Sequence, residues 1–491
     1  MRYPNRNPLC AVLLLLIAST SAAAAEDAQP TVRAIEGDGE PLSLETCIER
    51  ALESNEALLA ERQGRGELKG QKKQALSLGL PTIDLTGSWR RGRDPSFALD
   101  ESFQGAEGDG EGTGTPLDSL FGDLSFIPAP EEIPAQTFWR TSLNARWELR
   151  PGLVYNAVGA AGIGLDRQEA QIEEAEHRTI EEVMTAYYGV VLAGQEFAAI
   201  QADLEAKREF LEVTRNRFFA GLSTQLDTLR AAVAHANVLP QRRSARQALR
   251  DAGSALNILM GRSPDVPIAV VGGPDVETEP LDLDAYASRV EARPDIRQLA
   301  LMERIHRKNR GAQKAEHRPY LSADASYGYV TSIFEDLTDE GHDFWSAGVV
   351  LTVPLFDGLL TMGRVQETEA TIRRTHLQRK NAERQARRQI HSLVGELEAA
   401  RANLTAAELN LRAAEEALRQ VSLRYEIGKS DYLSVLTSQT DRLQARRNAI
   451  GARNNVLTLT ASLKRALGFR PDRSLARIDR EISGTDGREA D

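Results

Sequence analysis

Cysteine is almost absent from this sequence, which holds only Cys10 and Cys47 in 491 residues. Cys10 lies in an apolar run, residues 9–18, that follows two arginines and leads to small residues ending at Ala25. This order is typical of a secretory signal peptide, so we expect residues 1–25 to be removed. The mature chain would then keep Cys47 alone, which excludes an intramolecular disulfide and the cysteine-pair metal and redox motifs.

Positive charge and catalytic groupings are also scarce. The chain carries a net charge of −11, and loss of Arg2 and Arg6 with the signal would take it to −13. This balance argues against nucleic acid as a partner. The seven histidines are scattered, and no His-Glu-x-x-His motif or paired acid and base is present. We therefore expect no enzyme activity, no cofactor and no metal site.

Long apolar runs are missing too, because no stretch of the mature chain approaches the roughly 20 apolar residues of a membrane-spanning helix. An internal repeat is present instead. Gly221 and Gly428 are 207 residues apart, and so are Gly261 and Gly468, each pair within similar local sequence. The predicted division is a signal peptide 1–25, an N-terminal segment 26–41, a first repeat 42–261, a linker loop 262–282, a second repeat 283–468 and a flexible C-terminal tail 469–491.

Each repeat contains two segments in which apolar and polar residues alternate, typical of β-strands. They are residues 82–91, 137–150, 320–331 and 344–355. All four tryptophans lie in or beside them, and their length suits tilted strands that cross a bilayer. An ordinary sheet with one face on a core would show the same alternation, so the pattern leaves both readings open. The first pair of strands is separated by an acidic insertion rich in Gly and Pro, expected on the exposed side.

The helical period resumes after each strand pair and persists. In the first repeat apolar residues recur every seven positions, at Val183, Val190, Phe197, Leu204, Leu211 and Phe218. This spacing predicts a coiled-coil helix over residues 153–219, roughly 100 Å long. Helices are also expected at 42–80 and 283–318, before the strands, and at 224–260 and 431–467, after the long helices. Pro240 is expected to kink the first of the returning helices.

Two hairpin tips connect the long helices to the returning ones. The first tip covers residues 217–229 and the second covers residues 424–436. In each, the apolar run stops near an aromatic residue, turns at Gly221 or Gly428, and restarts behind a Ser, Thr or Asp cap. The glycines favour a left-handed backbone, so each segment predicts a tight turn between antiparallel helices.

Four strands cannot close a barrel, and a membrane barrel needs about eight or more, so several copies would have to contribute. The doubled plan of helix, strand pair and long helix, the Val-Pro-Leu-Phe-Asp-Gly segment at 353–358, and the paired tips resemble the TolC-like outer-membrane efflux proteins. The resemblance implies an α+β membrane protein with a two-repeat fold, in which four barrel strands and long antiparallel coiled-coil helices form each chain. It implies a homotrimer with a β-barrel and an α-helical tunnel.

The same resemblance implies a location and partners. Such trimers lie in the outer membrane lipid of Gram-negative cells and extend into the periplasm. They act as passive exit ducts of tripartite efflux or type I secretion systems, docked through a periplasmic adaptor to an inner-membrane transporter. The cargo stays open among small-molecule drugs, metal ions and secreted proteins. A periplasmic coiled-coil scaffold without a pore is the alternative that the heptads alone would allow.

The resemblance also assigns roles to the tips. Adaptor contact falls on the turn residues Gly221, Leu222, Ser223, Gly428, Lys429 and Ser430. A latch between an aspartate of the first tip and a tyrosine of the second corresponds to Asp227 and Tyr425.

An aspartate ring that narrows the aperture in the best-known members corresponds to Ser434 and Thr437, which are neutral. A neutral ring would lose the cation-selective field of carboxylates. Asp431 lies one turn nearer the tip and could replace that charge, although a helix N-cap role explains it equally well.

Overall fold

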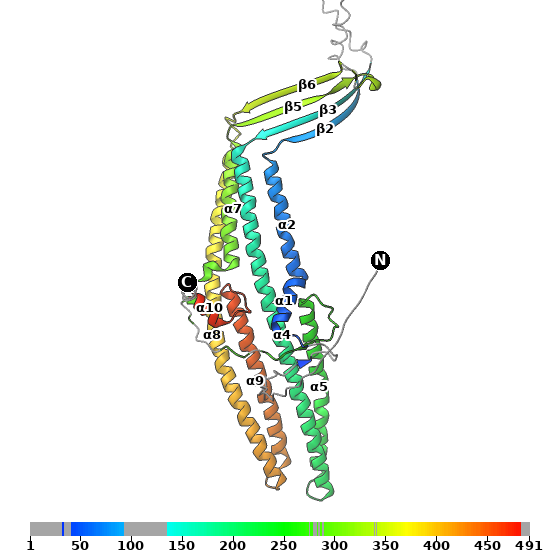
Figure 1. Ribbon diagram of the computed structural model, residues 1–491. Helices are drawn as coiled ribbons and strands as arrows, with labels where there is room; N and C mark the ends of the chain where they lie inside the picture. The colour runs from blue at the N-terminus through cyan, green and yellow to red at the C-terminus, as the bar shows by residue number, and fades with distance from the viewer. Residues whose placement is uncertain are drawn as a thin grey trace, which may run out of the picture.

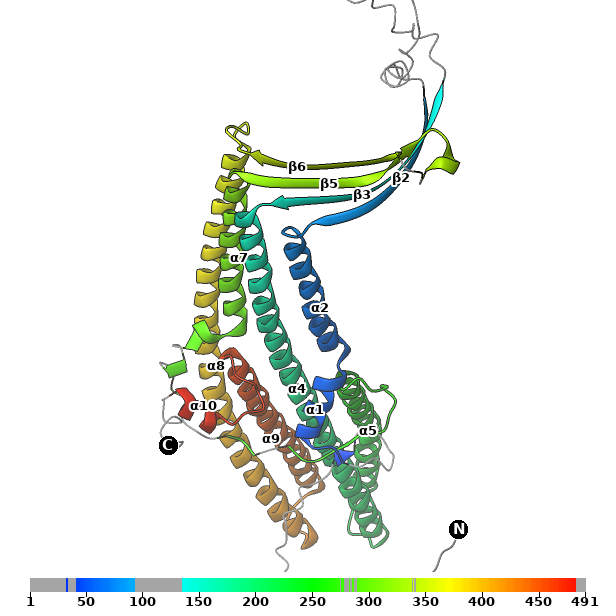
Figure 2. The same cartoon turned by 45° about the horizontal axis from the view of Figure 1, so that its top comes forward.

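A computed structural model describes residues 32–33, 41–92, 135–273, 275–277, 282, 285–286, 289–337, 339 and 341–482. The expected signal peptide, most of the segment 26–41 and most of the insertion between the first two strands lie outside these residues. The described chain is elongated, with a curved sheet at one end and long helices running away from it to two tips (Figures 1 and 2).

The two halves of the chain contain the same order of main elements. The first half contains β1 (Val32–Arg33), α1 (Leu44–Ser54), α2 (Glu56–Ser77), β2 (Thr82–Gly92), β3 (Gln136–Leu149), α4 (Pro151–Phe219), α5 (Gln225–Leu259) and β4 (Ala269–Val270). The second half contains the short 3-10 helix η3 (Arg289–Ala292), α7 (Pro294–Glu316), β5 (Tyr320–Thr331), the short 3-10 helix η4 (Phe334–Asp336), β6 (Asp343–Thr352), α8 (Leu360–Glu426), α9 (Tyr432–Ala466) and α10 (Leu475–Ile482).

The four long strands form one antiparallel sheet in the order β2-β3-β5-β6. Its register aligns side chains of one kind on each face. One row across the sheet is Leu85, Leu143, Tyr327 and Trp345, and the adjacent row is Asp84, Asn144, Ser326 and Ser346. The sheet therefore has one apolar and one polar face.

The apolar face of the sheet is not covered by any helix among the described residues. Leu85 is 76% exposed and Trp345 is 75% exposed, and the sheet extends away from the helices (Figures 1 and 2). The sheet is thus not the wall of a core within this chain, which decides against one of the two readings of the alternation. Strand β6 ends at Thr352, three residues before the predicted end.

The long helices begin at the sheet and end at the tips. Helix α4 has 69 residues and α8 has 67, so each is about 100 Å long. Helices α2 and α5 pack along α4, while α7 and α9 pack along α8, and α4 also contacts α7 and α9. Each long helix therefore has two shorter helices packed along it. Helix α5 is continuous through Pro240, and the expected kink stays a prediction.

Helix α4 is an exception to the expected lack of apolar stretches long enough to span a membrane. It contains a window that is long and apolar enough to cross a membrane, although 56% of that window is buried inside the protein. A buried core helix passes the same test because its apolar side chains face neighbouring helices. The apolar window is therefore consistent with a helix that packs against several neighbours, which for α4 are α1, α2, α5, α7 and α9.

The expected helices at 42–80 and 283–318 are each divided, which is a second correction. Asn55 separates α1 from α2, where its Oδ1 accepts a hydrogen bond from the Leu58 amide at 3.0 Å and caps the second helix. In the second half, Arg293 separates η3 from α7, which begins at Pro294. Proline lacks an amide hydrogen and disfavours a helical backbone at the residue before it, so a new helix starts there.

The expected flexible tail and linker loop are the third correction. Residues 475–482 form α10, in which Leu475 and Ile478 are fully buried. Their spacing of three residues places both on one side of a helix that also contains charged residues such as Arg477 and Arg480. In the linker, β4 pairs with β1, and Ile268 and Val270 are buried. Both segments therefore pack against the helices.

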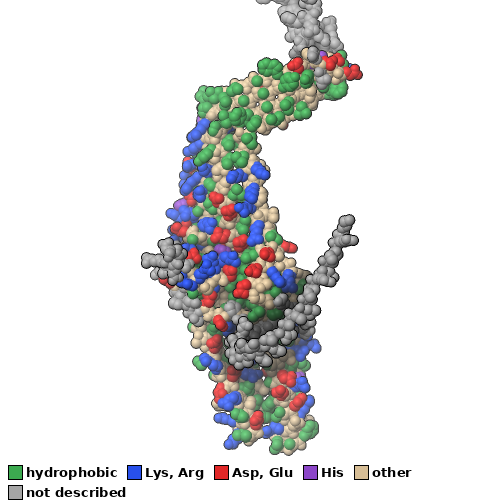
Figure 3. Space-filling model, in the orientation of Figure 1, with side chains coloured by type: hydrophobic (Ala, Val, Ile, Leu, Met, Phe, Trp, Pro, Cys, Tyr) green, Lys and Arg blue, Asp and Glu red, His purple; other side chains and the backbone are tan. Residues whose placement is uncertain are grey.

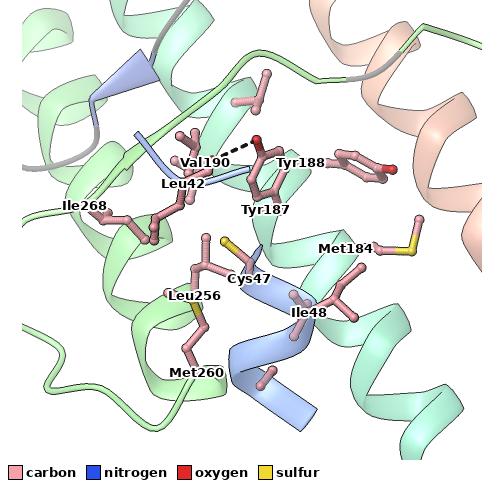
Figure 4. Packing of buried hydrophobic residues seen from close by; sticks show 14 of the residues in the cluster. Leu42, Cys47, Ile48, Met184, Tyr187, Tyr188, Val190, Leu256, Met260 and Ile268 are labelled. Atoms are coloured by element: carbon pink, nitrogen blue, oxygen red, sulfur yellow. Dashed lines mark hydrogen bonds between the residues drawn. The ribbon is translucent and has the colours of Figure 1, made fainter. Parts of the chain in front are cut away.

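Two apolar clusters lie at the middle of the helical part, and we call them together the equatorial core. The first joins α1, α4, α5 and β4 around Tyr187, whose hydroxyl donates a 2.7 Å hydrogen bond to the Val271 carbonyl oxygen. Figure 4 shows Tyr187 and Cys47 among these side chains. The second cluster joins α8, α9 and η3 around Leu397. Burial raises the pKa of the Cys47 thiol to about 11.

Candidate functional site

The first tip is a tight helix-terminating turn. Helix α4 ends at Phe219, and Gly221 has a φ of +73°. The Gly221 amide donates to the Phe218 carbonyl oxygen at 2.9 Å, and the Leu222 amide donates to the Arg217 carbonyl oxygen at 2.8 Å. These bonds satisfy the last carbonyls of α4, as in a Schellman-type C-cap.

The second tip repeats this geometry. Gly428 has a φ of +74°, and the Lys429 amide donates to the Arg424 carbonyl oxygen at 2.7 Å. An added Cβ at Gly221 or Gly428 would meet no atom within 4 Å, so backbone conformation, and not space, makes glycine the favoured residue. The predicted glycine turns are confirmed.

The returning helices start behind capping residues, as predicted. Asp227 and Thr224 form a capping box, in which the Asp227 carboxylate accepts from the Thr224 amide at 3.2 Å and from its hydroxyl at 2.7 Å. Asp431 caps α9 by accepting from the Ser434 amide at 3.2 Å and from the Ser434 hydroxyl. Hydrogen bonds from Thr224 and Ser434 lower the pKa values of Asp227 and Asp431, respectively.

An apolar cluster connects the two hairpins just above the tips. It contains Leu211, Ala231, Tyr425, Tyr432 and Val435, all buried, with Phe210 packed against them. We call it the tip cluster. The Phe210 ring centroid lies 5.2 Å from that of Tyr425 and 5.4 Å from that of Tyr432, and the second pair is stacked. Phe210 comes from α4, so these contacts connect the first half of the chain to the second.

Arg217 makes the polar connection between the hairpins. Its guanidinium donates to the carbonyl oxygens of Tyr425 and Glu426, each at 3.4 Å, and its Cζ lies 4.8 Å from the centre of the Tyr425 ring. Both carbonyls belong to the last turn of α8, where a cation is favoured by the helix dipole. Arg217 therefore stabilises the end of α8 from the neighbouring hairpin.

The expected latch residues lie in the same region but make other contacts. Within the described chain, no hydrogen bond joins Asp227 to Tyr425, because Asp227 caps α5 and the Tyr425 ring packs on Phe210. The Tyr432 hydroxyl is buried, and no described residue bonds to it. Burial and then the charge of Asp227 raise the pKa of Tyr432. The latch between Asp227 and Tyr425 stays a prediction, and Tyr432 is a second candidate for it.

The other expected site residues lie at the surface of the tips. Gly221, Leu222, Gly428, Lys429, Ser434 and Thr437 are exposed, while Ser223 and Ser430 are half-buried. Leu222 is 68% exposed, so the end of the first hairpin presents an apolar side chain to its surroundings. Adaptor contact at these turns and the neutral ring at Ser434 and Thr437 stay predictions.

Sequence reasoning missed three residues of this site, Phe210, Arg217 and Tyr432. The heptad positions single out Leu211 and Phe218, which lie beside Phe210 and Arg217 in the sequence. Tyr432 follows the cap residue Asp431 and precedes Val435 by three positions, which indicates a buried position on α9. The contact of Tyr432 with a distant helix is a property of the fold.

Among the residues that the structure describes, no group of three or more His, Cys, Asp or Glu side chains is placed to hold a metal ion. The arrangement at the tips consists of turns, caps and contacts between hairpins. Such groups can bind a protein surface or change the width of an opening.

Comparison with known proteins identifies outer membrane efflux proteins as relatives. The sequence profile described as "Outer membrane efflux protein" matches residues 47–262 and 286–469. The outer membrane efflux protein BepC of Brucella suis is 23% identical over 313 residues, which are 64% of this chain and 68% of that protein. The outer membrane protein TolC of Escherichia coli is 22% identical over 339 residues, 65% of this chain and 68% of its own.

A solved structure has the same fold. The CmeC outer membrane channel of Campylobacter jejuni is 17% identical and superimposes with a TM-score of 0.71, covering 90% of this chain and 89% of that one. At this identity the match describes the fold alone.

Proposed function

Because this chain belongs to the outer membrane efflux protein family, whose members are transport channels and not enzymes, we propose that it forms the exit duct of a tripartite efflux or type I secretion system. The protein is located in the outer membrane and extends into the periplasm. In the proposed role, export through the duct is passive, and an inner-membrane transporter supplies the energy.

The observation that carries the proposal is the two-faced sheet with uncovered faces and two free edges. Among the residues that the structure describes, strands β2 and β6 each have one partner. In lipid, their unpaired amide and carbonyl groups would cost several kcal/mol each. Pairing of β6 with β2 of the next copy removes both edges, and three copies would give a closed barrel of twelve strands. The apolar face would then contact lipid, and the polar face would line the lumen.

The helices give this barrel a continuation into the periplasm. Three copies of α4 and α8, with the shorter helices beside them, would form a tunnel about 100 Å long. The tips would close its far end and contact a periplasmic adaptor through the turns at Gly221 and Gly428. The cargo would be selected by the adaptor and transporter.

The test is the purified protein in detergent and in planar bilayers. We expect a detergent-dependent assembly with the mass of three chains and a uniform single-channel conductance. A water-soluble rod that remains monomeric and gives no conductance would contradict the duct and favour the pore-free periplasmic scaffold. Protein unfolded and refolded without detergent provides the matched control for current caused by contaminants.

A further inference from the structure

Two helices at opposite edges of the chain have faces that no described element covers. Helix α2 packs on α4 and α8 packs on α7, and in the strand order β2 and β6 are the two edges above them (Figure 1). If copies join through β2 and β6, then α8 of one copy lies beside α1 and α2 of the next. The inference below rests on that proposed assembly and concerns what holds it together beneath the membrane.

The uncovered face of α8 is basic. Arg373, Arg374, Lys380 and Arg384 are exposed, and none of them forms an ion pair with a described residue. Glu383, the one carboxylate between residues 373 and 388, pairs with Arg379 at 2.8 Å. Figure 3 shows Lys and Arg side chains gathered over α7 and α8 directly beneath the sheet.

This basic face also carries a shallow, open groove along α8 itself. It is lined by Ala370, Arg373, Arg374, Leu377, Gln378 and Asn381. Leu377 is 66% exposed in the middle of it. An exposed leucine between cations on a helix is suited to packing against another helix that carries carboxylates.

The uncovered face of α1 and α2 carries such carboxylates. Glu53, Glu56 and Glu67 are exposed, and no salt bridge joins them to a described residue. Cations share these helices, since Arg50 is exposed on α1 and Lys69 and Lys73 are exposed on α2 between Glu67 and the sheet. By contrast, the arginines on the side of α2 that packs on α4 are engaged, since Arg62 pairs with Glu176 at 2.8 Å.

The same face of α2 can accommodate a closely packed helix. A Cβ added at Gly66 or Gly70 would meet nothing within 4 Å, so both glycines leave open space beside the backbone. Small residues of this kind allow helix axes to approach. They lie on the turns next to Glu67.

The charges of the two faces match in height below the sheet. Helix α2 ends at Ser77 and α8 begins at Leu360, both adjacent to the sheet, and the helices run in opposite directions. At 1.5 Å per residue, Glu67 lies about 15 Å below the end of α2, and Arg373 lies about 20 Å below the start of α8.

The charged residues farther from the sheet match more closely in their distance below it. Glu56 and Lys380 lie about 32 Å and 30 Å below the sheet. Glu53 lies just beyond the break at Asn55, three residues before Glu56, and Arg384 lies about one turn beyond Lys380. A long Lys or Arg side chain spans differences of a few ångströms, so each carboxylate has a cation at its own height.

We propose that the lateral contact between copies is an ion-pair seam, in which Glu67, Glu56 and Glu53 of one copy contact Arg373, Lys380 and Arg384 of the next. Leu377 packs between the upper and lower pairs. The occupant of the α8 groove is a second copy of this chain. Because exposed ion pairs are screened by salt, the seam makes the assembly more stable at low ionic strength.

The test uses charge reversal and charge exchange in the full-length protein. We expect R373E/R384E to increase the dissociation rate of the oligomer roughly tenfold at low salt, because two attractive pairs at each contact become repulsive. The variant E53K/E67K/R373E/R384E exchanges both sides of the seam and should restore most of the stability. Arg304→Glu is a single charge reversal at an exposed site of α7, which packs between α4 and α8, and should have little effect.

Dissociation is measured by mass photometry after heating in detergent, at about 50 mM and 500 mM NaCl. Wild type and R373E/R384E should converge at the higher salt, where the Debye length is only a few ångströms. An oligomer that is unaffected by R373E/R384E, or a charge-exchanged variant no more stable than the double one, would overturn the seam and leave the duct intact. Absence of any wild-type oligomer would overturn the duct itself.

Discussion

The equatorial core and the tip cluster are both contacts between helices, but they differ in how many side chains they bury. The equatorial core holds fully buried residues from α1, α4, α5, α8 and α9, and the buried Lys464 pairs there with Glu277 of the linker at 2.9 Å. The tip cluster has five buried residues, and exposed side chains such as Leu433 surround it. Many buried contacts thus hold the equatorial core together, whereas few contacts hold the tip cluster together.

This contrast indicates where in the molecule movement requires the least free energy. Local opening is favoured where few apolar contacts are buried and where polar contacts face water. At the tips the polar connection between hairpins is Arg217, and the apolar one is the stack of Phe210 on Tyr432. A gate at this end would therefore open without disturbing the equatorial core.

The largest expected effect is on the free energy of unfolding and comes from a change in the equatorial core. Leu397→Ala removes a side chain that is 0% exposed, so the free energy of unfolding should fall by about 2–5 kcal/mol. Leu433→Ala at the tip, where the side chain is 55% exposed, should change it by less than about 0.5 kcal/mol. Urea unfolding followed by helical circular dichroism measures both. Equal losses would contradict the distinction between the two regions.

The second prediction concerns the connections between hairpins. Tyr425→Phe and Asp227→Ala should each raise single-channel conductance if the expected latch holds the tip closed, and Arg217→Ala should raise it by releasing the end of α8. Tyr432→Phe separates the two candidate tyrosines. If Tyr432→Phe raises the conductance and Tyr425→Phe does not, the latch tyrosine is Tyr432. Wild-type conductance in all four variants would reject a latch at the tip cluster.

A smaller effect is expected from restoring charge at the aperture. Thr437 is exposed on the first turns of α9, and Thr437→Asp would place three carboxylates around the proposed opening of a trimer. The ratio of cation to anion permeability should increase, because a ring of carboxylates attracts cations. Reversal potentials in a salt gradient measure it, and Thr437→Asn is the neutral control. An unchanged ratio would place residue 437 away from the ion path.

The smallest expected effect is the loss of the Asp227 helix cap of α5 in acid. Asp227 has a pKa lowered from its ordinary value of 3.8, so its capping contribution is complete above that value and is lost as the pH falls through the lowered pKa. Acidification through this lowered pKa should therefore loosen the first turn of α5 and leave the equatorial core unchanged. Hydrogen exchange of the residues after Thr224, followed from pH 5 downward after correction for intrinsic rates, measures this. Asp227→Asn should reduce the difference.

The sequence predicted the elements better than their contacts. Strand alternation, heptads and turn glycines are local patterns, so the four strands, the long helices and the turns at Gly221 and Gly428 could be derived from them. The helix break at Asn55 was missed because one capping residue hardly disturbs the helical period. Helix α10 was missed because two buried residues, Leu475 and Ile478, lie within a charged segment.

The site was predictable only in part for the same reason. Asp227, Tyr425 and Asp431 belong to recognisable turns and caps, so their positions followed from the repeat. Arg217 and Phe210 act on the other half of the chain, more than 200 residues away in the sequence. No periodicity within one helix reports such a contact, which depends on how α4 and α9 pack.

The most direct test of the duct is the current through a Thr437→Cys channel before and after a bulky thiol reagent is added to the tip side. The native Cys47 is buried, with a pKa raised to about 11, so it contributes little background labelling. Arg304→Cys on α7 is the control. We expect the conductance to fall on labelling of Thr437→Cys and not on labelling of the control. An unchanged current through fully labelled Thr437→Cys channels would contradict it.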